Sequence, residues 1–570
     1  MRTLLRATLA LVVIVPTTLL TAAQPPAPSV ARVTKPEDAR RRLGLLPDYA
    51  TVPGIKNVKV AVLDSGFAGV DGKRPYLPPD TVVVEHYAPE FVRKFGLGDP
   101  AFTKAFRPGD THGRQLAQVV WAATGNSPDG PKFYLLNANG PTMFRRAVRM
   151  AIESKVDIIL FGGTFEGAGN YDGRGPINAA VDEAVAAGIL WVNAAGNTGG
   201  AVFNGPVDVG LIGFVLFGQS QQTALRLRSR VDENEVTLTL TWNDYRDAED
   251  AGTEKDLDLV VEDERGAVVG ESKLKQVGPG RVAGEGETKN PRERLILTDL
   301  ATTLPGKEYR IRVKANTANF GARDRLRLLV TPGRPPVANA TTGRPEPSAE
   351  LLDATRGGEV YPPADHAGVL TVGDPSSASA VGPTADGRVK PDVIVSESVV
   401  RFTNGEETAG ASNAAAYFAG VVAVMRAAEP QLTAAHIREW VRVLDRAAAP
   451  PAPVGVGVVG QAAPLPPPAP VVPLSPNQLR ALRFSEYALD EKRRRGDPDP
   501  SVIVSSPSGV WVVRPGGRVT GVPPPVMPSA PAVVPAGQPV LPANNGRVEP
   551  VHVPWRTPTL RQIAELVRRR

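Results

Sequence analysis

The sequence predicts an α/β fold with a mostly parallel β-sheet flanked by helices, an inserted antiparallel β-sandwich and a Pro-rich C-terminal tail. Short apolar runs alternate with helical periodicity up to about residue 200, which implies right-handed crossovers and a parallel sheet. A two-residue period replaces this alternation from about 210 to 335. The chain has 57 prolines, and their concentration after about residue 449 predicts a segment outside any packed core.

The parallel sheet is expected from apolar runs that end in polar or turn residues. The pattern breaks off after residue 205 and resumes near 350, so one domain is expected in two parts, 55–205 and 350–447. The second part ends in an amphipathic helix over 433–446. The expected strands are 58–64, 132–136, 156–161 and 189–192, and the helices between them are 143–153 and 177–187.

The inserted segment 210–335 is expected to be a separate β-sandwich, because its short strands alternate apolar and polar residues and are separated by turns. Segments 236–242 and 309–313 show this alternation clearly. The acidic residues Asp256 and Asp258 allow a calcium site, although the residues provide no identifiable ligand set. No metal ligands are assigned, and no cofactor is required.

The N-terminus predicts a secretory signal peptide over residues 1–23. Arg2 and Arg6 precede an apolar run to Leu20, and small residues follow up to Ala23. An uncleaved anchor is the alternative, but Pro16 interrupts a run already shorter than the ~20 residues that a spanning helix needs. We therefore expect an exported protein (extracellular, periplasmic or cell-surface) with a short N-terminal segment over 24–54. The absence of cysteine excludes disulfides and thiolate metal sites.

The formal net charge of +6 comes from the end of the chain. Residues 477–570 contain 14 basic and 7 acidic residues, so the remainder is close to neutral. This distribution argues against a nucleic-acid groove in the main fold. We expect residues 448–570 to form a Pro-rich, largely disordered basic tail that could contact cell-surface anions, on a monomeric protein.

Ser412 is the candidate nucleophile, because Gly410-Ala411-Ser412-Asn413-Ala414-Ala415 places it at the start of a helix of small residues. A serine hydroxyl becomes nucleophilic when a neutral imidazole takes its proton and a carboxylate orients that imidazole. In isolation, the same pattern also fits a helix N-cap.

His112 and Asp64 are the candidate base and orienting acid. His112, in Asp110-Thr111-His112-Gly113, opens a predicted helix with an apolar face, although a histidine at such a position is often structural. Asp64 ends a predicted strand, where open α/β sheets carry functional groups. Its alternative is a turn or cap acid.

Asn197 is the candidate oxyanion donor, because it follows the predicted strand 189–192 in a turn of small residues. The N–H of Ser412, at a helix N-terminus, is expected to be the second donor. An asparagine in a left-handed turn is the alternative for Asn197.

Taken in chain order, these segments resemble the subtilisin-like serine peptidases (subtilases), in which the triad follows the order Asp, His, Ser. The resemblance covers roughly 55–200 and 355–447 and implies a serine endopeptidase with protein or peptide substrates. It implies a catalytic triad of Asp64, His112 and Ser412. It also implies substrate-aligning segments on either side of the primary pocket, at Gly162 and Gly163 and at Ala194, Ala195 and Gly196.

The chain departs from the family pattern at several positions near the site. Arg114 replaces the usual threonine after His-Gly, and Ala411, Asn413 and Ala416 replace threonine, methionine and proline around Ser412. Residues 24–57 are also short for the usual propeptide. A catalytically weak or inactive binding or scaffold protein is therefore the alternative function.

Overall fold

The computed structural model describes most of the two predicted peptidase segments and of the sandwich. The chain divides into two compact units, one from Pro451 to Pro550 and the other containing the rest. The predicted signal peptide and most of segments 24–54 and 448–570 lie outside the described residues. Those residues are 32–43, 45, 54–70, 77–84, 110–231, 234–248, 251–300, 307–334, 336–338, 345–439, 502–506, 509–513 and 519–522.

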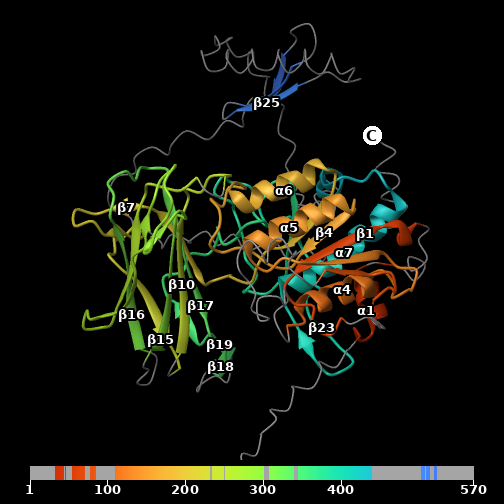
Figure 1. The fold of residues 1–570 in the computed structure, drawn as a ribbon, viewed down its shortest axis with the longest axis horizontal. Helices are drawn as coiled ribbons and strands as arrows, with labels where there is room; N and C mark the ends of the chain where they lie inside the picture. The colour runs from red at the N-terminus through yellow and green to blue at the C-terminus, as the bar shows by residue number, and fades with distance from the viewer. Residues whose placement is uncertain are drawn as a thin grey trace, which may run out of the picture. The chain divides into compact units, whose positions relative to one another are not determined.

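A seven-stranded sheet organises the larger unit, and every neighbouring pair in it is parallel (Figure 1). Its strand order is β2-β3-β1-β4-β5-β21-β22, so the predicted mixed α/β fold with a large parallel sheet is confirmed. The strands are β1 (Lys59–Asp64), β2 (Val82–Val84), β3 (Lys132–Asn137), β4 (Ile158–Phe161), β5 (Leu190–Ala194), β21 (Val369–Gly373) and β22 (Val393–Ile394).

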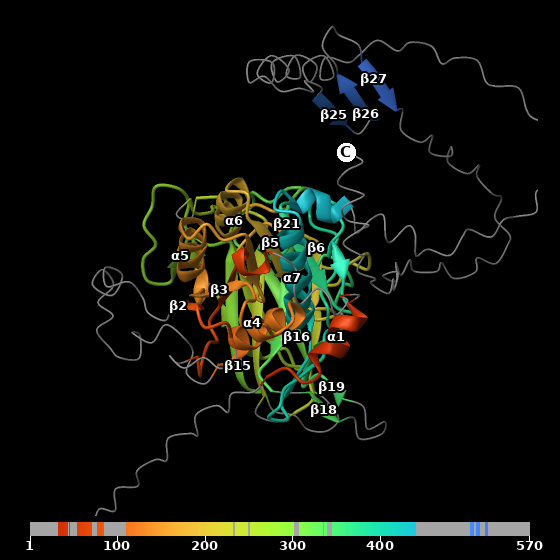
Figure 2. The same ribbon diagram turned by 90° about the vertical axis from the view of Figure 1, so that its right-hand side faces the viewer.

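Helices cover both faces of this sheet (Figure 2), because alternate strand residues point to opposite sides. Val60 and Val62 pack with one group of helices, whereas Ala61 and Leu63 pack with the other. The first group is α1 (Pro36–Arg42), α4 (His112–Ala123) and α7 (Ala411–Ala428), and the second is α5 (Gly140–Glu153) and α6 (Pro176–Ala186). A short 3-10 helix, η2 (Ile55–Asn57), precedes β1, and residues 434–439 are helical.

Two antiparallel sheets, in the orders β15-β10-β17-β6 and β12-β11-β16-β9-β20, share one apolar core that includes Leu238 from the first and Leu259 from the second. They form the sandwich predicted from the two-residue period. The strands are β6 (Val202–Pro206), β9 (Leu225–Ser229), β10 (Asn234–Trp242), β11 (Leu257–Glu262), β12 (Val268–Ser272), β15 (Arg292–Leu300), β16 (Lys307–Ala315), β17 (Arg325–Pro332) and β20 (Ala349–Leu351).

The sandwich extends beyond the predicted bounds of 210–335 at both ends. β6 adds to β17, and β20 adds to β9, each as the last strand of its sheet. The sequence pattern did not indicate them, because Val202 and Phe203 are both buried and β20 has only three residues.

Four two-residue pairs and one small sheet complete the described strands. The pairs are β7 (Asp208–Val209) with β8 (Val215–Leu216), β13 (Lys275–Gln276) with β14 (Glu287–Thr288), β18 (Val337–Ala338) with β19 (Pro345–Glu346), and β23 (Val400–Arg401) with β24 (Glu407–Thr408). Within the predicted tail, β25 (Val502–Ser506), β26 (Gly509–Val513) and β27 (Val519–Val522) form an antiparallel sheet.

Hydrogen bonds join the sandwich to the loop that follows β4, which we call loop 164–175. Asn170 and Tyr245 exchange two of them, from Asn170 Nδ2 to Tyr245 O and from Tyr245 N to Asn170 Oδ1, each at 2.7 Å. The Tyr245 hydroxyl donates to Gly167 O, and the Gly175 N–H donates to Asp247 Oδ1 at 3.0 Å. The sandwich therefore holds a loop of the domain that contains the parallel sheet.

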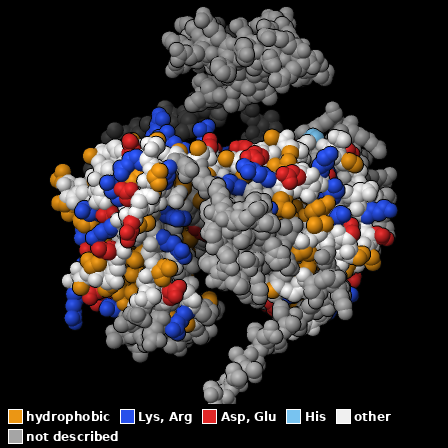
Figure 3. All heavy atoms as spheres, viewed as in Figure 1, with side chains coloured by type: hydrophobic (Ala, Val, Ile, Leu, Met, Phe, Trp, Pro, Cys, Tyr) orange, Lys and Arg blue, Asp and Glu red, His pale blue; other side chains and the backbone are white. Residues whose placement is uncertain are grey.

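The described surface carries both signs of charge. On the face shown in Figure 3, acidic and basic side chains are interspersed. No helix among the described residues is long and apolar enough to cross a bilayer.

Candidate active site

Asp64 and His112 meet at the carboxyl end of β1. His112 Nδ1 lies 2.8 Å from Asp64 Oδ2. The other carboxylate oxygen, Oδ1, accepts the N–H groups of Ser65 at 2.8 Å and Gly66 at 2.9 Å. The Asp64 side chain is 7% exposed and the His112 side chain 43%, so the imidazole is accessible to a substrate while its carboxylate partner is covered. This arrangement can orient an imidazole as a general base.

Two glycines allow β1 and α4 to approach closely enough for this contact. A Cβ on Gly113 would lie 2.4 Å from Asp64 Cβ, and one on Gly66 would lie 2.8 Å from the His112 backbone nitrogen. Neither position can hold a larger residue without displacing the pair. Glycine is therefore needed at position 113 for Asp64 and His112 to come into contact.

Asp110, which sequence reasoning did not assign a role, supports the first turn of α4. Its Oδ1 accepts the His112 N–H at 3.0 Å. The signal that could have identified it is an aspartate two residues before the first helical residue, because an Asp side chain often accepts the backbone N–H two positions on in an Asx turn. Asp110 thereby adds a second negative charge near the imidazole.

The pKa of His112 lies above its ordinary value of 6.5. Burial, the largest influence, lowers it, but the hydrogen bond and charge of Asp64 and the charge of Asp110 outweigh that effect. A raised histidine pKa favours the protonated form in the folded state. The resulting stabilisation is complete below the unfolded-state pKa and is lost as pH rises through the folded-state pKa.

We expect kcat/KM for peptide cleavage to rise with pH through an apparent pKa above 6.5, because His112 must be neutral to accept a proton. Asp110→Asn keeps an oxygen acceptor for the His112 N–H but removes a negative charge near the imidazole. It should therefore shift the rise of kcat/KM to lower pH. A pH–rate profile of both proteins tests the expectation. An apparent pKa at or below 6.5 in the wild type, or one that Asp110→Asn does not change, would contradict the expectation.

Ser412 and Asn197 lie together at the N-terminus of α7. Asn197 Oδ1 accepts the N–H of Ala411 at 3.1 Å, which leaves Asn197 Nδ2 available as a donor. Gly410, with φ 128°, precedes the helix, and a Cβ on it would lie 3.1 Å from the Asn197 amide atoms. Within the described residues, neither Asn197 Nδ2 nor the Ser412 N–H has an acceptor, so both can serve an oxyanion.

The Ser412 hydroxyl donates to Gly162 O at 2.7 Å. A Cβ on Gly162 would lie 3.0 Å from His112 Cε1 and 3.6 Å from Ser412 Cβ, so both side chains flank this glycine. The structure thus brings the predicted base and nucleophile to one point of the backbone. Proton transfer to His112 requires the hydroxyl to turn away from Gly162 O.

The two predicted substrate-aligning segments follow adjacent strands. Gly162 and Gly163 follow β4, while Ala194 ends β5 and Ala195 and Gly196 follow it; Phe161 is paired with Asn193 across the two strands. Asn193 Nδ2 donates to Gly163 O at 3.0 Å and fixes one segment to the other. Both segments therefore leave the sheet at the edge that holds the predicted triad.

Neither of the other described histidines has a setting like that of His112. His366 Nε2 lies 3.0 Å from Asp182, but that aspartate is 71% exposed and lies on α6, away from the predicted site residues. Burial lowers the pKa of His366. His436 exchanges hydrogen bonds with Thr433, the residue that precedes its own helix, and His86 and His552 lie outside the described residues.

Two departures from the family pattern have structural roles. Arg114 is buried, its Nη1 donates to Ala68 O at 3.0 Å, and its N–H donates to Gly66 O at 2.9 Å. It therefore holds the loop after Asp64. Asn413 Nδ2 donates to Ser398 O and to Thr408 Oγ1, both at 3.0 Å, and thus links α7 to the preceding loop.

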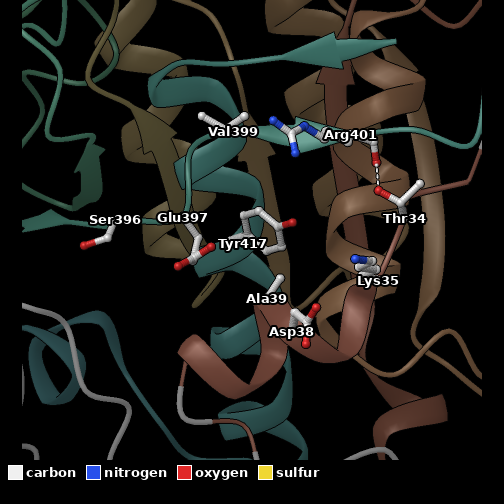
Figure 4. A pocket seen from close by; sticks show the side chains of 9 residues that line it. All are labelled: Thr34, Lys35, Asp38, Ala39, Ser396, Glu397, Val399, Arg401 and Tyr417. Atoms are coloured by element: carbon white, nitrogen blue, oxygen red, sulfur yellow. Dashed lines mark hydrogen bonds between the residues drawn. The ribbon is translucent and has the colours of Figure 1, made fainter. Parts of the chain in front are cut away.

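A separate cavity of about 500 Å³ lies between the N-terminal segment with α1 and the loop before β23 (Figure 4). Lys35 and Asp38 line one side, Glu397 and Arg401 the other, and Tyr417 of α7 faces it. Its lining contains none of the predicted site residues. Residues 32–43 are anchored beside this cavity: Val33 forms a β-bridge with Phe402, and Thr34 Oγ1 donates to Arg401 O at 3.0 Å.

The described residues do not suggest a metal site. No group of three or more of their acidic or histidine side chains is arranged to hold an ion. Asp256, one of the residues considered for calcium, accepts a hydrogen bond from Asn316 Nδ2 at 3.1 Å. A calcium site therefore remains a prediction without ligands.

Several solved protease structures are similar to this chain. The Clostridium perfringens CspB protease has 15% identity and a TM-score of 0.43, over 75% of this chain and 93% of that chain. MycP1 with its N-terminal propeptide removed has 14% identity and a TM-score of 0.28, over 71% of this chain and 86% of that chain. The nisin leader peptidase NisP of Lactococcus lactis has 11% identity and a TM-score of 0.28, over 73% of this chain and 89% of that chain. No protein-family model and no curated protein matches the sequence.

Proposed function

We propose that this chain is an exported serine endopeptidase of the subtilisin-like class, with Ser412 as nucleophile and His112 as general base. The observation that carries the proposal is the 2.8 Å contact between His112 and the buried Asp64 carboxylate, near Ser412 at the start of α7 and near Asn197, whose Nδ2 has no acceptor among the described residues. The proposed substrates are proteins or peptides, with no nucleic-acid partner. N-terminal sequencing of exported protein should then give Gln24 as the first residue.

The proposed reaction follows from the roles of these groups. His112 Nε2 takes the hydroxyl proton as Ser412 Oγ attacks the scissile carbonyl carbon, and Asp64 stabilises the imidazolium that forms. The tetrahedral oxyanion is held by Asn197 Nδ2 and the Ser412 N–H. The C–N bond breaks as His112 protonates the leaving amine, and water then hydrolyses the acyl-enzyme by the same base.

A catalytically weak or inactive scaffold is the second candidate, and one observation favours it. Ser412 Oγ donates to Gly162 O and not to His112, so the nucleophile is not poised for attack. For the peptidase, rotation about the Cα–Cβ bond of Ser412 must bring the hydroxyl to the imidazole. The two candidates differ in whether this rotation reaches a reactive geometry.

Labelling with a fluorophosphonate probe separates them. The peptidase should form an adduct that disappears in Ser412→Ala and in His112→Ala but persists in Ser377→Ala, which changes an exposed serine on a loop. Mass spectrometry of the labelled peptide locates the adduct. Absence of labelling in the folded wild-type chain would favour the scaffold.

A further inference from the structure

Glu166 is an acidic side chain in loop 164–175, three residues beyond the predicted substrate-aligning glycines. It is half-buried, and its Oε1 accepts the Thr164 hydroxyl at 2.8 Å. Thr164 in turn packs against the opposite segment, because its Cγ2 lies 3.5 Å from the position of a Cβ on Gly196. The carboxylate therefore lies close to both predicted substrate-aligning segments, at the place where Thr164 packs against Gly196.

No cation of the described residues neutralises this carboxylate. No Lys, Arg or His of the described residues contributes to the electrostatics of Glu166, although the Arg292 side chain lies against the neighbouring Gly167. Burial raises the pKa of the Glu166 carboxyl, and hydrogen bonds from its own backbone and from Thr164 offset part of that effect. A carboxylate that is withdrawn from water without a counter-charge gains most from a cation that enters with a ligand.

The backbone on both sides of Glu166 is anchored. The Phe165 N–H donates to Pro362 O at 2.7 Å, and Gly167 O accepts the hydroxyl of Tyr245 from the sandwich. Asn170, further along the loop, exchanges two hydrogen bonds with Tyr245. The loop thus holds the carboxylate in place before a substrate arrives, which reduces the ordering cost of binding.

We propose that Glu166 selects substrates with a cationic side chain, Lys or Arg, immediately before the cleaved bond. The position follows from the two segments on either side of the primary pocket, so this inference rests on the proposed peptidase function. An entering ammonium or guanidinium group would pair with the Glu166 carboxylate beside Thr164. The inserted sandwich then contributes to specificity by fixing the loop that carries this residue.

Matched peptides that differ only in arginine or its neutral isostere citrulline before the scissile bond test the proposal. We expect the wild type to favour arginine by about 10²-fold in kcat/KM, and Glu166→Gln to remove most of this preference. Glu183→Gln, which changes an exposed glutamate on α6, should keep the full preference. Equal cleavage of the two peptides by the wild type would overturn the inference, as would an arginine preference that Glu166→Gln leaves unchanged.

A second measurement requires no variant and covers the case in which Glu166→Gln fails to fold. n-Butylguanidinium should slow fluorophosphonate labelling of wild-type Ser412, whereas the neutral n-butylurea should not. Equal effects of both compounds would overturn the cation site while labelling itself still supported the peptidase. Absence of labelling in folded protein would instead overturn the peptidase, so the two failures are distinguishable.

Discussion

His112→Ala is expected to lower kcat for peptide hydrolysis by about 10⁶-fold, because it removes the group that accepts the Ser412 proton. The loss should be catalytic rather than structural. The His112 side chain is 43% exposed, and Asp64 keeps the N–H groups of Ser65 and Gly66 as partners when the imidazole is gone. Steady-state kinetics and circular dichroism of the variant test both parts of this expectation.

A second variant, with a smaller expected loss of activity, tests the role of the Asp64 carboxylate. Asp64→Asn should lower kcat by about 10⁴-fold, since an asparagine amide no longer stabilises the imidazolium or its required tautomer. His436→Ala, at a histidine outside the site, should leave kcat unchanged. Retention of more than one hundredth of the activity in His112→Ala would show that another group is the base.

Arg327→Ala is expected to destabilise the protein by about 3 kcal/mol, because Arg327 is a buried cation between the sandwich and the domain of the parallel sheet. Its guanidinium carbon lies 3.6 Å from the centre of the Tyr171 ring and 5.3 Å from that of Tyr361, and Nη1 donates to Val360 O at 2.7 Å. Burial raises the pKa of Tyr171 well above 10, so its ring stays neutral and attracts the cation. The variant loses these contacts and leaves a cavity.

The matched control lies on the same strand. Arg325 is exposed two residues earlier in β17, and Arg325→Ala should change stability by less than about 0.5 kcal/mol. Urea unfolding of the two variants under identical conditions measures the difference. Equal midpoints would show that the buried arginine does not hold the two parts together.

The sequence predicts the parallel sheet and the sandwich core well, because their signals are local. An apolar run that ends in Asp64 marks β1, and the alternation in Val236–Trp242 falls within β10. The proximity of Asp64, His112, Asn197 and Ser412 also follows from local context, since strand and helix ends in such a fold meet at one edge of the sheet. Their assignment as catalytic residues remains a prediction.

Other features depend on contacts between distant segments and could not be predicted. Nothing in the residues around Tyr245 indicates that it hydrogen-bonds Asn170, 75 positions away. The role of Arg114 likewise depends on the carbonyl of Ala68, 46 positions away. The hydrogen bond from Ser412 to Gly162 is a matter of side-chain rotation, which sequence patterns do not determine.

Hydrogen bonds between the two ends of the sandwich affect the order in which the parts of the chain can fold. Thr355 N donates to Val202 O and Asn204 N donates to the Thr355 hydroxyl, each at 2.8 Å. A sandwich that folds first shortens the effective loop between the neighbouring strands β5 and β21, which lowers the entropic cost of closing it by about 2 kcal/mol. Asp64 and His112 leave the ribosome before the sandwich, and Ser412 after it. A growing chain therefore has the acid and the base but no nucleophile until most of the fold has been made.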